Sequence, residues 1–365
     1  MFSSSRSGLL GPISLAFAAA TVRRRTPRAL SAASAAAAAN RTSTFDLDAA
    51  AAEMARKGFV HVPLGADITP TAAEDVARAL MRLAPSGGGS YNGGGGVTRD
   101  VIGDSNFLNA GAGAPAELRI QFHNEMAYSR AFPQFVTFAM FNQARADGTT
   151  LLVDNVRVTR ALSRALADKM RALGVQYVRL LHDDAHAADP DFYAAWQGAF
   201  QTRDEAEAMA RANAAPDSFM TRHDAKRLRQ VSWSPVFVTH PEHGELYFSS
   251  ILNRHASWLD GHAVWGAMPH RERPYQCVWG DGSELSEAEL AELRDVHDGN
   301  MEMLRLEQGD LVVMDNLRVA HGRTSYTPGP DPRLIGLLLS DMVDREPARS
   351  QPPAAFGQIR AAALA

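Results

Sequence analysis

The stretch GDLVVMDNLRVAHGRTSYTPGPDPRLIGLLLSD, residues 309–341, contains two apolar runs separated by a turn-rich segment. Each run is short, rich in Val, Ile or Leu, and bounded by Gly, Pro, Asp or Asn, which predicts two β-strands. Further strands are predicted at residues 118–128, which include FHNEMAY (122–128), and at residues 135–141. Strands at both ends of a domain that enclose a helical middle favour an antiparallel barrel over a doubly wound sheet.

FHNEMAY also raises a functional hypothesis. Because strand side chains alternate between faces, His123 and Glu125 are predicted to point the same way. An imidazole and a carboxylate that converge form half of a metal site; the alternative is a polar pair on a solvent-facing surface. His321 lies beside Gly322, where the backbone can come close to a ligand. His123, Glu125 and His321 would together suit iron(II), with three positions left open, and the same ligand types also suit zinc.

Two further residues suggest an anionic cosubstrate. Arg333 begins the second apolar run, and an Arg on a buried strand needs a carboxylate partner. Thr150, in ADGTTLLVD, could offer its hydroxyl to the same carboxylate. An Arg and a Thr near iron fit 2-oxoglutarate, whose keto-acid end would bind the metal while its far carboxylate would meet the Arg. Arg323, which is close to His321, is the competing anchor.

The composition narrows the function classes. The chain has 365 residues, of which 45 % are hydrophobic, and this suffices for a substantial core. The formal net charge of −4 gives no global basic field that would attract nucleic acid or an anionic membrane. Cys277 is the only cysteine, so a disulfide framework and a cysteine zinc cluster are excluded, and any metal must use His and carboxylate ligands.

The sequence divides into three parts. Residues 1–44 are rich in Arg, Ser and Ala and contain no acidic residue, which is typical of a transit peptide for an organelle, either mitochondrion or plastid. Residues 45–345 form the predicted globular domain, with a helix-rich polar insert at about 157–230. Residues 346–365 are rich in Pro and Ala and are interpreted as a tail.

Local patterns predict the elements that surround the strands. Apolar spacing and charge predict helices at residues 46–57, 71–83, 159–173 and 287–296. The His-Gly turn in PEHGELYFSS, residues 241–250, predicts a hairpin.

Two other motifs are interpreted as loops. PSGGGSYNGGGG, residues 85–96, lacks the Lys-Ser/Thr of a phosphate-binding loop, so a surface loop is favoured. LHDDAH, residues 181–186, could hold a second metal, but its polar surroundings favour a solvated loop, with a substrate lid as the functional alternative.

The motifs HNEMAY, DGTTLLVD, WQGAFQT, THPEHGELYF, GDGSELS and GDLVVMDNLRVAHGR, taken in this order, resemble the taurine dioxygenase/clavaminate synthase-like family of iron(II)- and 2-oxoglutarate-dependent oxygenases. The resemblance runs from about residue 90 to 343. It implies an α+β, mainly β fold: a double-stranded β-helix (jelly-roll) barrel with a helical insert and flanking helices. It implies iron on His123, Glu125 and His321, and 2-oxoglutarate on Thr150 and Arg333.

The same resemblance implies hydroxylation of a small, amino-acid-like molecule, with consumption of O2 and release of succinate and CO2. Glu125 argues against halogenation, because related halogenases have a small residue in place of the carboxylate. Asp147-Gly148 stands where the family usually has Gly-Gly, a departure close to Thr150.

Other functions remain open from the sequence. A zinc-dependent hydrolase could use the same three ligands, and a non-catalytic jelly-roll binding protein could retain them by descent. Desaturation or ring closure could replace hydroxylation. The sequence leaves the oligomeric state open.

Overall fold

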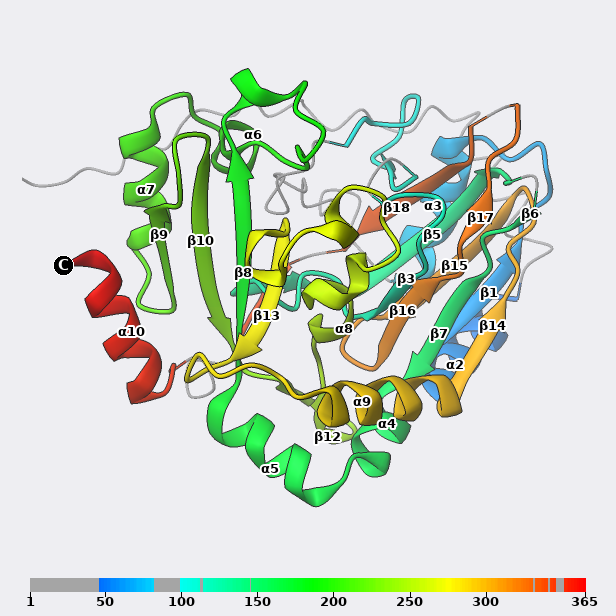
Figure 1. The fold of residues 1–365 in the computed structure, drawn as a ribbon. Helices are drawn as coiled ribbons and strands as arrows, with labels where there is room; N and C mark the ends of the chain where they lie inside the picture. Colours follow the sequence, from blue (N-terminus) through cyan, green and yellow to red (C-terminus); the bar gives the residue numbers. More distant parts are fainter. Residues whose placement is uncertain are drawn as a thin grey trace, which may run out of the picture.

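Antiparallel strands form most of the domain around the predicted site (Figure 1). The computed structural model describes residues 46–81, 99–111, 114–144, 146–330, 332–340, 342–345 and 351–365. The expected transit peptide, residues 1–44, and the Gly-rich stretch, residues 85–96, therefore lie outside the described residues.

The first sheet has five strands, all paired antiparallel. Strands β15 and β5 are mostly apolar and buried because both faces of the sheet are covered. In order across the sheet, the strands are β1 (Phe59–Pro63), β15 (Asp310–Asp315), β5 (Phe135–Asn142), β18 (Leu334–Leu339) and β2 (Leu108–Asn109).

The second sheet carries the expected metal ligands and faces the first sheet across an apolar layer. Val136 and Phe138 of the first sheet pack in one buried cluster with Leu152 and Val319 of the second. In order, its strands are β14 (Met301–Leu304), β7 (Thr150–Asp154), β16 (Val319–Arg323) and β3 (Ile120–His123).

Helices cover the outer faces of both sheets. Helices α2 (Leu47–Lys57) and α3 (Pro70–Met81) pack on the first sheet, as both had been predicted from apolar spacing. The helix predicted at 159–173 is in fact two helices, α4 (Asn155–Ala161) and α5 (Arg164–Leu173), because the Ser163 hydroxyl accepts from Leu166 N and starts a new helix. The charged helix is confirmed as α9 (Glu287–Asn300).

The insert is more strand-rich than predicted. Its long strands pair into a third sheet at the left of Figure 1, which α6 (Trp196–Phe200) and α7 (Glu205–Asn213) flank. The prediction of a helix-rich insert missed β8 because this strand is buried along almost its whole length and shows no polar–apolar alternation. In order, the strands are β13 (Tyr275–Trp279), β8 (Val175–His182), β10 (Arg227–Ser234) and β9 (Ser218–Arg222).

Three short two-stranded sheets complete the strand pairing. The hairpin predicted from the His-Gly turn is confirmed as β11 (Phe237–His240) and β12 (Gly244–Tyr247). The other pairs are β6 (Ala146–Asp147) with β17 (Tyr326–Thr327), and β4 (Ala131–Pro133) with β19 (Met342–Asp344).

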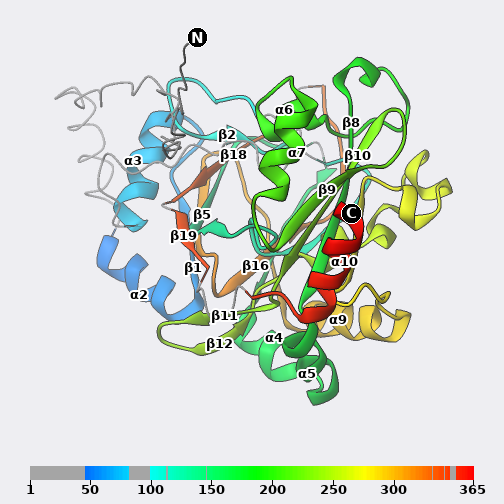
Figure 2. The ribbon, with the colours of Figure 1, turned by 90° about the vertical axis from the view of Figure 1, so that its left-hand side faces the viewer.

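The carboxyl-terminal segment is not simply a tail. Residues 354–364 form helix α10 (Ala354–Leu364), which crosses the third sheet in Figure 2. Phe356 is fully buried there against Phe219 and Val231. The Pro/Ala composition concealed this contact because few side chains provide it, chiefly Phe356 and Ile359.

The architecture is thus a mixed α/β fold with many antiparallel strands. Among the described residues, the hydrogen-bonded sheets stay separate and do not close into one barrel. In the same part of the chain, no helix has both the length and the apolar character needed to cross a lipid bilayer.

Candidate active site

The structure brings His123, Glu125 and His321 together. His123 and His321 are direct partners in the register of β3 and β16, and their ring centroids are 4.3 Å apart. Oε2 of Glu125 lies 3.9 Å from Nε2 of His123 and 3.7 Å from Nε2 of His321. In the described ranges, this is the one group of three or more His, Cys, Asp or Glu residues whose ligand atoms all lie within 4.8 Å of one another.

Glu125 reaches this point by a route that the alternation argument did not foresee. Strand β3 ends at His123, and Glu125 lies in the turn that follows, so the strand predicted over 118–128 is too long. Met126 has a φ of 60°, which reverses the chain direction locally. The convergence of His123 and Glu125 was thus correct, but its stated reason, strand alternation, was wrong.

Two buried asparagines fix this turn: Asn124, which flanks the predicted ligands and was a candidate for contact with a substrate, and Asn316, which sequence reasoning missed. Oδ1 of Asn316 accepts from Glu125 N at 2.8 Å, and its Nδ2 donates to Glu125 O at 3.0 Å. Asn124 donates through Nδ2 to the carbonyl oxygens of Asn316 and Val319. Asn124 therefore holds the backbone beside the ligand rather than facing a substrate. The pair DN at 315–316, directly after an apolar strand, was the only signal.

Both histidines present a free lone pair. Nδ1 of His123 donates to Gln121 O at 2.9 Å, which leaves Nε2 as the acceptor that faces Glu125. Burial lowers the pKa of His123, against the opposing effect of Glu125, and burial also lowers the pKa of His321 well below its ordinary value. Neutral imidazoles and an adjacent carboxylate are the donor set that a divalent metal needs, so the three residues fit an iron(II) ion.

Thr150 and Arg333 line the same cavity as the three candidate ligands. Thr150 begins β7 and is paired with Arg323 of β16. Arg333 directly precedes β18 and is 8 % exposed. The structure therefore assembles all five predicted site residues in one cavity between the two main sheets.

The two competing arginines differ in what they already bind. Arg323 donates to the carbonyl oxygens of Thr324, Pro115 and Leu118, at 2.7 to 3.0 Å. Arg333 makes only a long 3.5 Å hydrogen bond to Gly148 O within the described residues. No carboxylate in that part of the chain lies within 4 Å of Arg333, and burial lowers its pKa. Arg333 is thus the arginine with donors left for a ligand carboxylate.

Aromatic and polar side chains complete the wall of the cavity. Tyr193 of the insert meets Tyr275 edge-to-face, with ring centroids 4.9 Å apart. The insert therefore contributes directly to the wall of the cavity. The other wall residues relevant here are Arg99, Tyr128, Asn253, Arg254 and Trp258.

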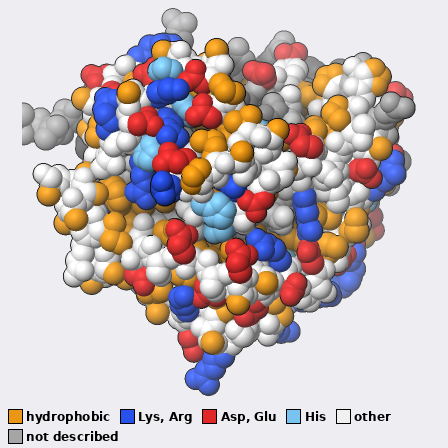
Figure 3. Space-filling model, in the orientation of Figure 1, with side chains coloured by type: hydrophobic (Ala, Val, Ile, Leu, Met, Phe, Trp, Pro, Cys, Tyr) orange, Lys and Arg blue, Asp and Glu red, His pale blue; other side chains and the backbone are white. Residues whose placement is uncertain are grey.

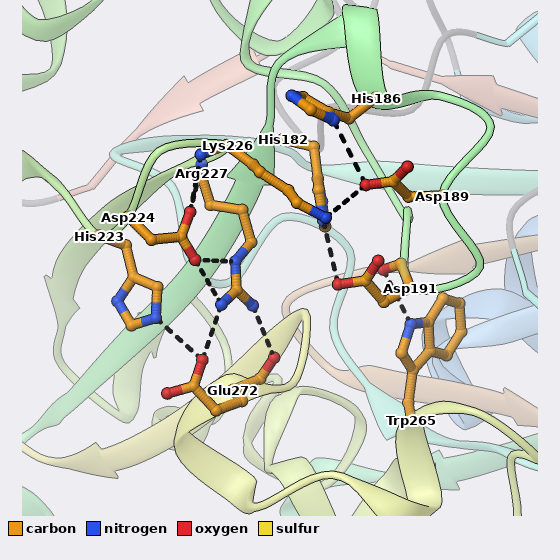
Figure 4. A network of polar contacts seen from close by, with 10 residues as sticks. All are labelled: His182, His186, Asp189, Asp191, His223, Asp224, Lys226, Arg227, Trp265 and Glu272. Carbon is orange, nitrogen blue, oxygen red and sulfur yellow. Dashed lines mark hydrogen bonds and ion pairs between the residues drawn. The ribbon is translucent and has the colours of Figure 1, made fainter.

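LHDDAH does not form a second metal site. His182 is buried at the end of β8, with Nε2 3.5 Å from Oδ2 of Asp191, whereas His186 faces Asp189 (Figure 4). Nζ of Lys226 lies 2.6 Å from Oδ2 of Asp189. The carboxylates of this segment therefore form ion pairs and do not converge on one point. Figure 3 shows His, acidic and basic side chains together at the upper left of the molecule, near the ends of β8 and β10. The prediction of a solvated loop holds for His186 but not for the buried His182.

The family follows from a comparison with known proteins. The model of the "Taurine catabolism dioxygenase TauD, TfdA family" matches residues 31–338. The chain belongs to this family. It is a family of dioxygenases, which are oxidoreductases, and iron(II) and 2-oxoglutarate are the metal and cosubstrate of the family.

Individual relatives of this TauD-family chain are distant. The dapdiamide synthesis protein DdaC of Enterobacter agglomerans is 26 % identical over 218 residues, 58 % of this chain and 63 % of that protein. This match spans less than two thirds of DdaC. A clavaminate synthase-like protein of Arabidopsis thaliana is 23 % identical over 243 residues, 65 % of this chain and 70 % of that protein.

Solved structures were compared in the same way. Asparagine oxygenase, in complex with Fe(II), 2S,3S-3-hydroxyasparagine and succinate, gives a TM-score of 0.48 at 15 % identity, over 83 % of this chain and 79 % of that chain. AAD-2, in complex with Mn(II) and N-oxalylglycine, gives a TM-score of 0.45 at 14 % identity, over 82 % and 88 % of the two chains.

Proposed function

We propose that this TauD-family enzyme hydroxylates a small, amino-acid-like substrate in the cavity between its two main sheets. The observation that carries the proposal is the shared cavity, in which three converging ligand atoms and a buried Arg with unused donors face the same space. A metal and a dicarboxylate together would satisfy both features.

His123, Glu125 and His321 would hold iron(II). When bound, iron(II) supplies the redox chemistry by which O2 converts 2-oxoglutarate to succinate and CO2 and one oxygen atom enters a C–H bond of the substrate. The protein's own contribution is positional. The Asn316 amide fixes the turn that carries Glu125, and Phe138 packs against the ring of His321 with centroids 5.1 Å apart.

Arg333 would bind the far carboxylate of 2-oxoglutarate through its unused N–H donors, and Thr150 would add a hydroxyl. Arg323, held by three carbonyl oxygens, would form the wall behind them. Tyr326 lies against both guanidinium groups, at 4.6 Å from Arg323 and 5.5 Å from Arg333, and orients them.

The finer description of the fold is also part of this proposal. The two facing sheets are read as the two halves of a double-stranded β-helix, with the metal ligands between them. Support comes from the apolar layer shared by β5, β15 and β18 of one sheet and β7 and β16 of the other.

Succinate production tests the proposed reaction. The full chain, supplied with iron(II), ascorbate, air and 2-oxoglutarate, is expected to release succinate even without its substrate, at a slow uncoupled rate. Arg333→Ala should raise the concentration of 2-oxoglutarate needed by about 10- to 100-fold, because one charge-assisted contact is lost. Arg160→Ala, on the exposed surface of α4, is the matched control. Tight zinc binding with no succinate would instead support a zinc-dependent hydrolase.

We also propose that residues 1–44 direct the protein to a mitochondrion or plastid. Support comes from their Arg, Ser and Ala content and their lack of acidic residues. Residues 1–44 fused to a fluorescent protein, expressed in a plant cell, should place the fluorescence in one organelle. Fluorescence spread through the cytosol would contradict the proposal.

A further inference from the structure

The cavity contains an arginine that the proposed reaction does not use. Arg254 ends the short helix α8 (Ile251–Arg254), which packs against β3, the strand of His123. Its guanidinium carbon lies 4.2 Å from the ring centroid of Tyr275 and 4.7 Å from that of Tyr128. Two aromatic faces therefore hold the planar guanidinium in a fixed orientation.

No carboxylate balances Arg254 within the described part of the chain. No Asp or Glu oxygen of the described residues lies within 4 Å of its nitrogens, and its Nε is buried without a hydrogen-bond partner there. Its guanidinium hydrogen-bonds to the side chain of Tyr275. A buried cation that has only neutral partners costs folding free energy, and an anionic ligand would recover that cost.

On the side of Arg254 that faces away from the metal ligands, the described residues offer no unpaired carboxylate either. Tyr128, Arg254 and Tyr275 also border a neighbouring cavity, so they form the partition between the two spaces. The carboxylate of Asp217 in that second cavity already pairs with Arg130 at 2.7 Å. Among the described residues, no carboxylate therefore supplies the missing negative charge, and a bound anion would supply it.

The charges of the proposed reaction leave Arg254 unmatched. Iron(II) carries two positive charges, which Glu125 and the keto-acid carboxylate of 2-oxoglutarate would balance. The other carboxylate would balance Arg333. Arg254 is close enough to His123 to affect its pKa. None of these three negative groups, however, pairs with Arg254 in the proposed reaction.

The neighbouring residue adds a complementary group. Asn253 is buried and lines the same cavity, and its Oδ1 has no hydrogen-bond partner among the described residues. A buried carbonyl oxygen of this kind accepts an N–H or O–H donor. An anion for Arg254 and a donor for Asn253, on adjacent residues, describe a molecule with a carboxylate and an N–H group close together.

We propose that Asn253 and Arg254 form the head-group site for the substrate, and that the substrate is a carboxylate with a neighbouring amino or amide N–H, such as an α-amino acid. This inference rests on the proposed function for the reaction but on different residues for the binding. The side chain of such a substrate would extend from the Tyr128–Tyr275 partition toward the metal ligands, along a wall that includes Tyr193 and Trp258.

Binding measurements test the site without requiring turnover. The full chain is loaded with Mn(II) and N-oxalylglycine, and the common L-α-amino acids are compared with their carboxamides by thermal shift and by calorimetry. At least one acid should bind about tenfold or more tightly than its amide, because the amide lacks the charge that Arg254 needs. Asn253→Leu should weaken binding of that acid more than binding of the matching acid without its amino group.

Variants of the arginine separate charge from packing. Arg254→Met should remove the preference for acid over amide, Arg254→Lys should keep part of it, and the exposed Arg160→Met should keep all of it. If Arg254→Met fails to fold, the preference for acid over amide in Arg254→Lys and in the wild type still tests the proposal. Wild-type protein that binds acids no more tightly than amides, or that binds none of the acids, overturns the proposal. The iron(II)–2-oxoglutarate visible band reports separately on the proposed function, and Arg254→Lys should retain it.

Discussion

His123 and His321 face each other across the paired strands β3 and β16, with ring centroids 4.3 Å apart. The pairing matters because two distant parts of the sequence then share one rigid sheet. Glu125 is added from a turn that two buried asparagines hold, so the protein's own contacts position all three side chains.

Removal of one ligand should abolish tight metal binding. Glu125→Ala takes away the only carboxylate of the set and leaves two neutral imidazoles that burial keeps uncharged. We expect the affinity for iron(II), or for Mn(II) as its stand-in, to fall by about 100-fold or more by calorimetry. Glu302→Ala, which alters an exposed carboxylate, is the control. Unchanged metal affinity in Glu125→Ala would move the metal site elsewhere.

Asn316 should contribute to both stability and metal binding. Its amide makes three buried hydrogen bonds, two with Glu125 and one with Pro133 O at 2.8 Å. Asn316→Ala should lower the free energy of unfolding by about 2–4 kcal/mol, since backbone groups lose their partners. Metal affinity should fall as well, because the turn that carries Glu125 loosens. Asn300→Ala loses one bond, to Val296 O, and should change neither property by more than about 1 kcal/mol.

Helix α10 should act as part of the folded domain. Phe356 is fully buried against Phe219 and Val231, so Phe356→Ala should cost about 3–4 kcal/mol in denaturant unfolding if the helix stays in place. Leu364→Ala, at a side chain 40 % exposed, should cost much less. A Phe356→Ala protein with wild-type stability would show that the helix does not contribute to the fold.

His297 should make the protein less stable in acid. Burial lowers its pKa to about 4, and the ring stacks against Phe122 with centroids 5.5 Å apart. Its folded pKa is below the unfolded value, so its stabilising effect is full above about pH 6.5 and is lost as the pH falls toward 4. Between pH 7.5 and 5 the loss should be about 2 kcal/mol.

The variant His297→Gln separates this effect from general acid sensitivity. Unfolding by urea at pH 7.5 and at pH 5 should show a smaller difference in the variant than in the wild type, because Gln does not titrate. An equal difference in both proteins would mean that other groups, such as His255, whose pKa burial also lowers to about 4, account for the acid sensitivity.

The sequence was sufficient to predict the main strands and the five residues that the structure brings together in one cavity. β15 and β18 are apolar runs between turn residues, and such runs are predictable because both faces of their sheet are covered. Thr150 and Arg333 came from chemistry and family resemblance, and the structure places both in the cavity.

Other features depend on three-dimensional contacts that no short pattern reveals. β3 ends early because Asn316, far along the chain, bonds the backbone of Glu125. The sequence did not indicate a role for Arg254, because the observation that suggests one is spatial: no carboxylate of the described residues lies near it. Phe356 is one aromatic residue in an Ala-rich segment. Only its packing on the third sheet shows that this segment is not a tail.

The most direct test of the central claim is the visible absorption of the anaerobic protein with iron(II). Addition of 2-oxoglutarate should produce the weak visible band of its chelate with iron, and Arg333→Ala should shift the titration to about 10- to 100-fold higher 2-oxoglutarate. A wild-type protein that binds iron(II) but develops no band would contradict the assignment of this cavity to iron and 2-oxoglutarate.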